Sequence, residues 1–371
     1  MDFLLTDEQQ AILESAELLL SKEVTSESLR SIESDASAMY DTALWSKLAE
    51  AGLLGLVVPE EYGGLGQGFL ELGLLLEQIG RSVAPVPVLP AAIGALAIAE
   101  FGSALQRDAL LPGVCAGDVI VVPALVEPGG EPMRPATTAR PHSSGWVLDG
   151  LKTCIGGGFV ADQLLVSASL SPEETGLFLV DPASSGVVVL CQDTISYAPE
   201  ARVELTNVVV RPEDRIGDDT TLAWISQRYT AGVGAVAAGV AGESVRMTSE
   251  YVKTREQFNR PIATFQAVGH RLADCFIDAT AIRLTALKAA WALSTAATAH
   301  KEVAVAKFYA AEAGQRIARA TVHLHGGVGV DRDYPLHRYY LWAKHLELTL
   351  GGASEQLVTL GAALAAEPAS A

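Results

Sequence analysis

The stretch that decides the fold is TREQFNRPIATFQ, Thr254–Gln266, which joins two long segments of helical periodicity. Apolar and small residues recur at helical spacing over Trp224–Thr254 before it and Phe265–Thr295 after it, and Pro261 marks the turn between them. Both segments are as long as the helices of a helix bundle. Arg255 lies in the last helical turn, where an arginine often only complements the helix dipole. The stretch predicts two consecutive bundle helices and leaves the role of Arg255 open.

Helical periodicity continues from this stretch to the end of the chain. Three further helices are predicted: Lys301–His325, Pro335–Leu350 and Ser354–Ala365. The first long helix carries glycines that permit close contact between helices: Gly232, Gly234, Gly239 and Gly242. A bundle of long helices is therefore expected over residues 219–371.

Two regions of different periodicity precede the bundle. Residues 118–218 alternate with a period of two and contain six β-branched runs: Val119–Val126, Trp146–Cys154, Gln163–Ala168, Leu177–Val180, Val187–Cys191 and Ala201–Val210. Residues 1–117 read as helices, at Gln9–Lys22, Trp45–Leu54, Phe69–Ile79 and Ala91–Phe101. The predicted fold is multi-domain α+β: an N-terminal helical domain (1–117), a middle β-barrel or sandwich (118–218) and a C-terminal helical bundle (219–371).

The composition limits the partners. Lys and Arg (26) minus Asp and Glu (44) give a net charge of −18, so the chain repels a nucleic-acid backbone. It would also repel an anionic thioester carrier such as coenzyme A, unless local Arg or Lys or a partner chain supplies positive charge. Only 19% of the residues are charged, which indicates surface buried between subunits.

The cysteines and the N-terminus indicate a cytoplasmic protein. Cys115, Cys154, Cys191 and Cys275 show no ligand spacing, so reduced, mostly buried thiols and no metal site are expected. The start, MDFLLTDEQQ, lacks a basic stretch before an apolar one, so no signal peptide is expected. No apolar run reaches the ~20 residues of a membrane span.

Several common site motifs are missing, and one glycine motif is present. The chain contains no GxGxxG after a strand, no GxxxxGK[ST], no HExxH and no GxSxG, which argues against a Rossmann dehydrogenase, a nucleotidase, a metalloprotease and a serine hydrolase. His323–Val330 reads HLHGGVGV. Its glycines fit a helix C-cap, and the same bare backbone amides also suit a phosphate-bearing ligand.

Three segments together resemble the acyl-CoA dehydrogenase family. They are AGLLGLVVPEEYGGLG at Ala51–Gly66, the run Arg255–Gln266, and HGGVGV at His325–Val330, in the order that the family has them. The resemblance extends over the whole chain. It implies an N-terminal helical domain, a middle β-domain and a C-terminal four-helix bundle, which is the order of periodicities described above. It also implies a flavoprotein with FAD as cofactor.

The family's chemistry needs a carboxylate that takes the α-proton of the thioester while the flavin takes a hydride. This chain has no glutamate at either family position. Leu350 or Gly351 occupies the position before the last helix, and Arg228 or Tyr229 occupies the position in the first bundle helix. Three carboxylates lie nearby in sequence but are displaced from these positions: Glu243, Glu347 and Glu355.

The segments that the family uses around the flavin ring also differ. The family's Thr-Glu-Pro-x-Ala-Gly-Ser-Asp loop appears here as Val126–Pro132, without its Thr, Ser and Asp hydrogen-bonding groups. The family's Trp-Ile-Thr strand appears as Cys154-Ile155-Gly156. Cysteine cannot stack as tryptophan does, and glycine cannot supply the hydroxyl of threonine.

The chain does match the family at the half of the cofactor site that holds the pyrophosphate and adenine of FAD. In the family, FAD lies across a subunit interface, and the neighbouring chain holds its pyrophosphate and adenine end. The residues that match this second role are Arg255, Gln257, Phe258, Gln266, His323, Gly326 and Gly327. His323 replaces the family's usual Gln, and Asn259 replaces a common Gly.

Such a division resembles the non-catalytic β subunit of the α2β2 acyl-CoA dehydrogenases of actinobacterial steroid side-chain degradation. The resemblance implies a homologous catalytic partner chain, a sterol side-chain CoA thioester bound mainly by that partner, and an electron-transfer flavoprotein or similar acceptor. Two alternatives remain open. One is a self-sufficient homotetramer whose base is Glu243 or Glu347, and the other is a non-redox scaffold or dehydratase on the same fold.

Overall fold

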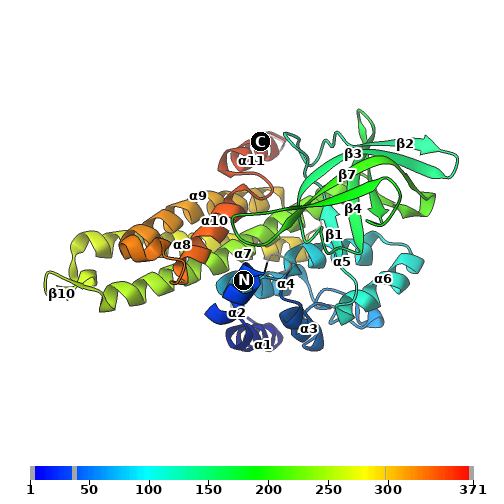
Figure 1. The fold of residues 1–371 in the computed structure, drawn as a ribbon. Coiled ribbons are helices and arrows are strands. Elements are labelled where there is room, and N and C mark those ends of the chain that lie inside the picture. The colour runs from blue at the N-terminus through cyan, green and yellow to red at the C-terminus, as the bar shows by residue number, and fades with distance from the viewer. Residues whose placement is uncertain (1–4, 36–39, 297, 367–371) are drawn as a thin grey trace. The chain divides into compact units, whose positions relative to one another are not determined.

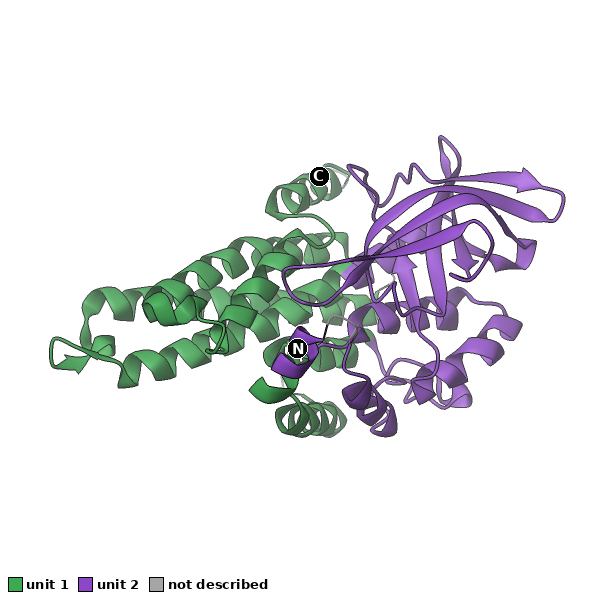
Figure 2. Cartoon of the chain, viewed as in Figure 1, with its two compact units in different colours: residues 1–29, 69–84, 230–371 green, residues 30–68, 85–229 purple. Residues whose placement is uncertain are grey.

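The computed structural model of the protein describes residues 5–35, 40–296 and 298–366. The chain forms two compact units, each assembled from separate segments (Figure 2). Unit 1 takes residues 1–29, 69–84 and 230–371, and unit 2 takes residues 30–68 and 85–229. The predicted order of helices, then strands, then long helices is confirmed (Figure 1). The domain limits at 117 and 218 stay predictions.

Unit 2 is built on an eight-stranded sheet with the order β6-β7-β3-β2-β4-β5-β8, and β1 pairs with β4. The strands are β1 (Val121–Ala124), β2 (Thr138–His142), β3 (Gly145–Gly156), β4 (Gln163–Ser171), β5 (Glu174–Val180), β6 (Val187–Gln192), β7 (Glu200–Val210) and β8 (Arg215–Gly217). β4 and β5 are antiparallel, with Leu164 opposite Val180, and their apolar side chains are buried. They form the centre of the core of this unit.

Helices complete unit 2. They are α3 (Thr42–Glu50), the short η1 (Glu60–Tyr62), α5 (Val88–Phe101), α6 (Ala104–Ala116) and η2 (Pro212–Asp214). α5 packs directly on β1: a Cβ on Gly94 would lie 1.9 Å from the carbonyl oxygen of Val121. The helix is apolar around most of its circumference, as expected for a helix that is buried on most sides.

Unit 1 is a helical bundle. It contains α1 (Asp7–Glu23), α4 (Phe69–Ser82), α7 (Asp219–Thr254) from Thr230 onward, α8 (Gln266–Thr295), α9 (His300–His325), α10 (Leu336–Leu348) and α11 (Ala353–Ala365). Three short segments connect the long helices: the two-stranded pair β9 (Glu256–Gln257) and β10 (Arg260–Pro261), η3 (Ile262–Thr264) and η4 (Gly326–Val330). α8 and α9 lie side by side, and the hairpin of β9 and β10 is found at one end of the bundle (Figure 1).

Of the four glycines predicted to allow close packing, Gly239 does so most clearly. A Cβ at Gly239 would lie 1.9 Å from the carbonyl oxygen of Glu77 in α4. A Cβ at Gly80 of α4 would likewise lie 2.0 Å from the carbonyl oxygen of Val236. The backbones of α4 and α7 therefore touch. Gly242 lies three residues further along α7. None of the described atoms considered lies within 4 Å of the position that a Cβ at Gly242 would take.

Gly239→Ala is expected to lower the free energy of unfolding by about 1–3 kcal/mol, because the new methyl group must push the α4 backbone away. Gly242→Ala is the matched control on the same helix. It meets no atom and should stabilise α7 by up to about 1 kcal/mol, because alanine favours the helix. Urea unfolding of both variants measures this, and equal effects of the two substitutions would contradict the packing argument.

The structure also contains elements that the periodicity did not predict. α2 (Ser26–Ser34) and α6 are helices, although α6 includes Pro112. A capping box at Ser103 and Gln106 supports the start of α6, where sequence periodicity is weak. β2 was not predicted because its side chains are mostly exposed and do not alternate. β8 has three residues, too few to show a period.

Candidate functional site

A tight hairpin joins α7 to α8 in unit 1. β9 and β10 pair antiparallel, and the two residues between them, Phe258 and Asn259, have φ values of 54° and 59°. Positive φ at both central positions is the pattern of a type I′ turn, which phenylalanine adopts only under strain. The Phe258 side chain is 87% exposed. An exposed aromatic residue on strained backbone is typical of a contact with a ligand or another chain.

Local contacts fix this hairpin and direct Arg255 outward. The N–H of Ile262 donates to the carbonyl oxygen of Arg255 at 2.8 Å. The guanidinium of Arg260 lies 4.2 Å from the ring centroid of Phe265. Arg255 directly follows the last residue of α7, and its N–H donates to the Tyr251 carbonyl, which ties it to the end of the helix. Its side chain is exposed.

Two exposed glycines, Gly326 and Gly327, follow the end of α9. Gly326 has φ 62° and ψ −140°, a conformation that side chains disfavour. No atom lies within 4 Å of the Cβ positions of Gly326 and Gly327, and both residues are exposed. The Gly326 N–H donates to the carbonyl oxygen of His323, so the helix cap is present. The cap also leaves open space above the backbone, which a ligand can approach.

A buried histidine joins the end of α9 to α7. The His325 ring stacks on Tyr251 with centroids 4.2 Å apart. His325 Nδ1 lies 2.8 Å from the carbonyl oxygen of Thr321 and therefore carries the proton, and Nε2 accepts from the Tyr334 hydroxyl at 3.3 Å. These contacts place Gly326 next to the α7 end that carries Arg255.

The protein is expected to lose stability as the pH falls below about 6.5. Burial lowers the pKa of His325 below its ordinary value of 6.5, and burial lowers the pKa of His345 in α10 in the same way. The unfolded chain therefore takes up protons at these sites before the folded chain does, and proton uptake favours unfolding. The urea concentration at the unfolding midpoint should decrease as the pH is lowered from 7.5 to 5.5. The decrease should be smaller for His325→Gln. An equal decrease in both proteins would contradict this role.

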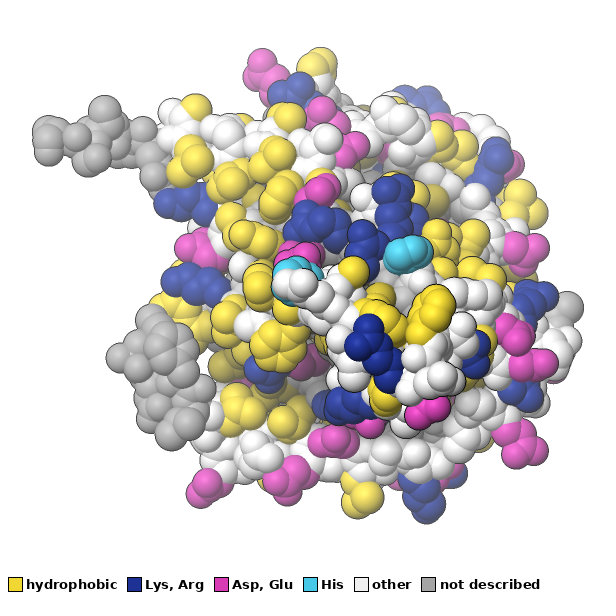
Figure 3. Space-filling model, turned by 90° about the vertical axis from the view of Figure 1, so that its left-hand side faces the viewer, with side chains coloured by type: hydrophobic (Ala, Val, Ile, Leu, Met, Phe, Trp, Pro, Cys, Tyr) yellow, Lys and Arg dark blue, Asp and Glu magenta, His cyan; other side chains and the backbone are white. Residues whose placement is uncertain are grey.

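The structure brings the seven predicted residues to one end of unit 1. All seven are exposed: Arg255, Gln257, Phe258, Gln266, His323, Gly326 and Gly327. Arg271 Nη1 of α8 lies 3.5 Å from Nδ1 of His323, which joins the start of α8 to the end of α9. Figure 3 shows the face at this end, where Lys, Arg and His side chains gather around exposed apolar ones. The geometry fits a shared site, and the binding role of each residue remains a prediction.

The charge at this end contrasts with the net charge of the chain. Four arginines of unit 1 form ion pairs with carboxylates: Arg81, Arg246, Arg283 and Arg316. Four others have no carboxylate of the described residues within ion-pair distance: Arg255, Arg260, Arg271 and Arg319. These four lie on the hairpin, the first turns of α8 and the end of α9. In a chain of charge −18, they make this end of unit 1 locally cationic.

Sequence reasoning missed Arg260 and Arg271 as members of this cluster. Arg260 is within the recognised run but matched no family role, and Arg271 follows it on α8. Asp274 stands three residues after Arg271, at the spacing of a helical ion pair. The sequence could not show that this pair does not form. That Arg271 instead contacts His323 is a consequence of how α8 packs on α9.

Neither family position for the base carries an acid in the structure. Leu350 has φ 56°, and the carbonyl oxygen of Gly351 accepts from Nζ of the buried Lys307 at 2.8 Å. In unit 2, the Arg228 guanidinium lies 3.5 Å from the centroid of Trp224, and burial lowers its pKa to about 10. Tyr229 is 7% exposed, and burial raises the pKa of its hydroxyl. A neutral phenol of this kind is a poor proton acceptor.

Two of the three displaced carboxylates form ion pairs within the chain. Glu243 accepts from Nε and Nη2 of Arg246 at 2.6–3.0 Å and lies 3.6 Å from Arg81. Glu347 pairs with Lys344 at 2.5 Å. Both carboxylates are thus engaged by neighbouring cations of the chain itself.

In the strand segment that corresponds to the flavin-ring side, two glycines lie close to side chains of unit 2. A Cβ on Gly156 would lie 3.3 Å from the Tyr229 hydroxyl, and one on Gly157 would lie 2.9 Å from Cβ of Pro87. Cys154 has φ 52° at an irregularity of β3, and its N–H donates to Oε1 of Gln192. A side chain at either glycine would therefore crowd these neighbours, whereas Cys154 next to them is exposed.

The loop Val126–Pro132, which corresponds to the family's other ring-side segment, is held to the interior of unit 2 through Glu127. Glu127 accepts from Nζ of Lys152 at 2.6 Å and from the N–H groups of Ala136 and Thr137. Lys152 also donates to the Ser167 hydroxyl. Burial opposes ionisation of Glu127, but Lys152 and these hydrogen bonds outweigh it and lower its pKa. Glu127 is therefore a structural residue here.

The cysteine prediction is partly wrong. All four are free thiols and Cys275 is buried, but Cys154 and Cys191 are exposed. Cys191 lies on β6, which is an edge strand, and Cys154 lies at the irregularity of β3. Among the described residues, no group of three or more His, Cys, Asp or Glu side chains could hold a metal ion. No described helix is long and apolar enough to cross a membrane.

Comparison with known proteins assigns the family. Residues 6–118 match the model "Acyl-CoA dehydrogenase, N-terminal domain", and residues 228–364 match "Acyl-CoA dehydrogenase, C-terminal domain". The chain is similar to the acyl-CoA dehydrogenase FadE27 of Mycobacterium tuberculosis, with 38% identity over the full length of both proteins. It is 33% identical to FadE28 of the same organism, with 98% of each chain covered.

Solved structures agree with this assignment. The ChsE4-ChsE5 complex from Mycobacterium tuberculosis contains a chain 38% identical to this one, with a TM-score of 0.94 over 100% of both chains. The Tcur3481-Tcur3483 steroid ACAD contains one that is 42% identical, with a TM-score of 0.92 over 97% of this chain and 98% of the other. On the family models, the full-length relatives and the shared fold, the chain belongs to the acyl-CoA dehydrogenase family.

Proposed function

We propose that this chain is the non-catalytic subunit of a heteromeric, FAD-dependent acyl-CoA dehydrogenase. It holds the ADP end of an FAD whose ring, together with the catalytic base, belongs to a homologous partner chain. The substrate is the CoA thioester of a steroid side chain, and an electron-transfer flavoprotein or similar acceptor reoxidises the complex. Similarity to the steroid ACAD and to the ChsE4-ChsE5 complex supports the substrate class and the heteromeric assembly.

One contrast carries the proposal. The clamp, which we define as the seven exposed residues Arg255, Gln257, Phe258, Gln266, His323, Gly326 and Gly327, is open and contains one arginine. The ring-side segment at residues 154–157 has Tyr229 and Pro87 close to its glycines and offers neither an aromatic side chain nor a hydroxyl at the positions that the family uses. The residues present fit the diphosphate half of the cofactor and do not fit the ring half.

Each part of the clamp has a defined task. Arg255 presents a planar guanidinium that can form two parallel hydrogen bonds to a phosphate. Gly326 and Gly327 allow a phosphate to approach the backbone without contact with a side chain. Phe258, exposed at the tip of the hairpin, offers a ring face to the adenosine portion. His323 donates a hydrogen bond where the family's usual glutamine would.

The same contrast assigns the chemical step to the partner. When bound, FAD accepts the hydride from the β-carbon of the thioester. The α-proton must go to a carboxylate fixed within hydrogen-bond reach of it. This chain has Leu350, Gly351, Arg228 and Tyr229 at the family positions, and its nearby Glu243 and Glu347 are ion-paired. A partner chain with a glutamate at one of these positions would complete the reaction.

The test is to purify this chain alone and after co-expression with the product of the neighbouring reading frame. The visible spectrum gives the flavin content, and dehydrogenation of a steroid side-chain CoA thioester gives the activity. We expect a colourless, inactive protein alone and a yellow, active complex. A yellow and active chain alone would favour a homotetramer with a relocated base. No flavin in either preparation would favour a non-redox scaffold.

Arg255→Ala is expected to reduce the affinity of the complex for FAD by about tenfold or more, because a charge-assisted, bidentate contact to phosphate is lost. Arg255→Lys keeps the charge but loses the fork geometry and should fall in between. Flavin release during dilution, followed by fluorescence, measures the effect. Arg283→Ala, at an ion-paired arginine of α8, is the control and should leave flavin content unchanged. Full retention in Arg255→Ala would contradict the clamp.

A further inference from the structure

We propose that Tyr251, His325 and Tyr334 are positioning residues of the clamp, because their packed rings fix the distance between the Arg255 end of α7 and the Gly326 amide at the end of α9. This role rests on the proposed function, and it concerns residues outside the seven of the clamp. None of the three has to touch the cofactor, since each acts through a clamp residue. We call the three rings the aromatic cluster.

The aromatic cluster lies inside unit 1 and joins three segments of it. The His325 ring is stacked on Tyr251 of α7, with centroids 4.2 Å apart and ring planes 23° from parallel. Tyr334, which precedes α10, has its centroid 5.2 Å from that of His325 and 6.2 Å from that of Tyr251. His325 is only 3% exposed. Rings that touch cannot approach further and lose favourable contact when they separate, so the cluster sets the spacing of the three segments.

Each side of the aromatic cluster is connected directly to one half of the clamp. Tyr251 lies one helical turn before Arg255, and its carbonyl oxygen accepts from the Arg255 N–H at 2.8 Å. Residues four apart lie on the same side of a helix. On the other side, His325 directly precedes Gly326. A shift of the His325 ring relative to Tyr251 would therefore change the distance between Arg255 and the Gly326 amide.

Hydrogen bonds hold the aromatic cluster in one arrangement. The Tyr251 hydroxyl donates to the carbonyl oxygen of His325 at 3.3 Å, and the Tyr334 hydroxyl donates to Nε2 of the His325 ring at 3.3 Å. Nδ1 of the buried His337 lies 2.7 Å from the carbonyl oxygen of Tyr334. The segment after His325 is held as well, because a Cβ on Gly329 would lie 3.1 Å from Cβ of His325. The start of η4 is therefore packed against the cluster.

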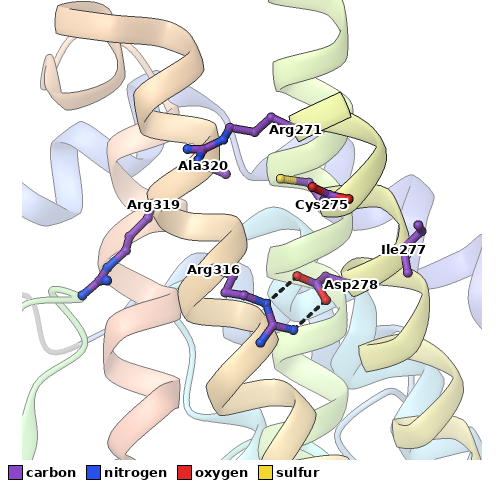
Figure 4. A pocket seen from close by; sticks show the side chains of 8 residues that line it. Arg271, Cys275, Ile277, Asp278, Arg316, Arg319 and Ala320 are labelled. Carbon is purple, nitrogen blue, oxygen red and sulfur yellow. Dashed lines mark hydrogen bonds and ion pairs between the residues drawn. The ribbon is translucent and has the colours of Figure 1, made fainter. Parts of the chain in front are cut away.

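The contacts between α8 and α9 are of a different kind. Arg316 of α9 donates to both carboxylate oxygens of Asp278 of α8, at 2.7 and 2.9 Å, and Arg271 extends from α8 toward Ala320 of α9 (Figure 4). The Arg316 side chain is 49% exposed, and an exposed ion pair between flexible side chains contributes little. This pair joins α9 to α8 and does not involve α7. We therefore assign the placement of the Arg255 end of α7 to the aromatic cluster.

The clamp needs a fixed spacing because both of its halves have to reach one diphosphate. Hydrogen bonds from a guanidinium to a phosphate are about 2.7–2.9 Å long, and a donor at about 3.6 Å no longer forms one. A relative shift of about 1 Å between Arg255 and Gly326 would therefore break the contacts of one of them. The expected consequence of a disturbed cluster is weaker binding of FAD.

The test measures the FAD affinity of the complex between the full-length chain and the product of the neighbouring reading frame. The complex is freed of flavin and titrated with FAD, and flavin fluorescence gives the Kd. His325→Leu removes the stacked ring, whereas His325→Phe keeps a flat ring and loses both ring nitrogens. Tyr251→Leu removes the stack from the α7 side, so the test does not depend on whether His325→Leu folds. Urea unfolding of each variant chain gives its stability.

The matched control is Tyr309→Leu on the same helix. Tyr309 packs against Phe308 with centroids 5.6 Å apart, and it lies about 24 Å before His325 along α9 at the rise of a helix. Its substitution removes an aromatic contact of the bundle without touching the aromatic cluster. Any loss of FAD affinity that comes only from a less stable bundle would appear in this control.

We expect His325→Leu and Tyr251→Leu to weaken FAD binding by about fivefold or more, and His325→Phe and Tyr309→Leu by less than about twofold. His325→Phe should nevertheless lose stability, because the Thr321 carbonyl oxygen loses its donor. FAD affinity would then follow the ring contact and not the stability. Equal losses of FAD affinity in His325→Leu and His325→Phe would overturn the inference, and so would unchanged affinity in both leucine variants.

A double-mutant cycle with Arg255→Ala separates this inference from the proposed function. Once the guanidinium is gone, Tyr251→Leu has less to displace, so the double variant should bind FAD at least about threefold better than the product of the two single losses predicts. Losses that simply multiply would overturn the positioning role and leave the proposed function intact. Full FAD affinity in Arg255→Ala would instead contradict the proposed function itself.

Discussion

Lys152→Met is expected to lower the free energy of unfolding by about 3–5 kcal/mol, one of the two largest effects expected of a single substitution in this chain. Lys152 is fully buried, and its Nζ lies 2.6 Å from Glu127 and 2.9 Å from the Ser167 hydroxyl. Burial lowers the pKa of Lys152 to about 8, although Glu127 opposes this. Methionine would leave the Glu127 carboxylate buried without its cation.

Urea unfolding gives the size of this effect, and two further variants identify its cause. Lys253→Met removes an exposed ion pair with Glu250 and should change stability by less than about 1 kcal/mol. Lys152→Met/Glu127→Gln removes both charges and should recover part of the loss, since no unpaired charge stays buried. If the double variant is as unstable as the sum of its single variants, the two residues are not coupled.

Lys307→Met is the second substitution with a large expected effect, about 2–4 kcal/mol. Nζ of the buried Lys307 donates to three carbonyl oxygens, those of Leu346, Glu347 and Gly351, at 2.8–3.1 Å. It thus joins α9 to the end of α10 and to the loop that precedes α11. Burial lowers its pKa to about 8. Methionine fills a similar volume but leaves the three carbonyls without their donor.

Urea unfolding also measures the stability of Lys307→Met, and Lys253→Met is again the control. Hydrogen exchange adds a local readout, because the amides of residues 349–352 should exchange faster than those of α8. Lys307→Arg keeps a positive charge but must fit a larger planar group, so it should recover little of the loss. Wild-type stability in Lys307→Met would show that the three carbonyls find other donors.

The sequence by itself determined the order of the elements and the family. Long helices such as α8 and α9 show many repeats of the helical period, and strands such as β4 and β7 have enough residues to show theirs. The seven candidate clamp residues could also be named from the sequence, because all of them lie in two short runs, Arg255–Gln266 and His323–Gly327, and their binding role stays a prediction. What depends on local order along the chain was predictable.

Elements with few repeats of a period were not predictable. β8 has three residues, β9 and β10 have two each, and β2 is exposed on most of its length. The exposure of Cys154 was missed for a related reason. It depends on an irregularity in the pairing of β3 with β7, which no propensity of Cys154 indicates.

The tertiary structure alone decided which charges are neutralised. Nothing in the sequence distinguishes Glu127, turned inward to Lys152, from an exposed loop carboxylate, or Arg316, paired with Asp278, from the unpaired Arg271. Pairing across elements depends on distances between residues far apart in the chain, and helix packing sets those distances. For the same reason the approach of the Tyr229 hydroxyl to Gly156 could not be predicted. The sequence suggested a flavin site of which one half is retained, and only the fold brought the seven residues of that half to one end of unit 1.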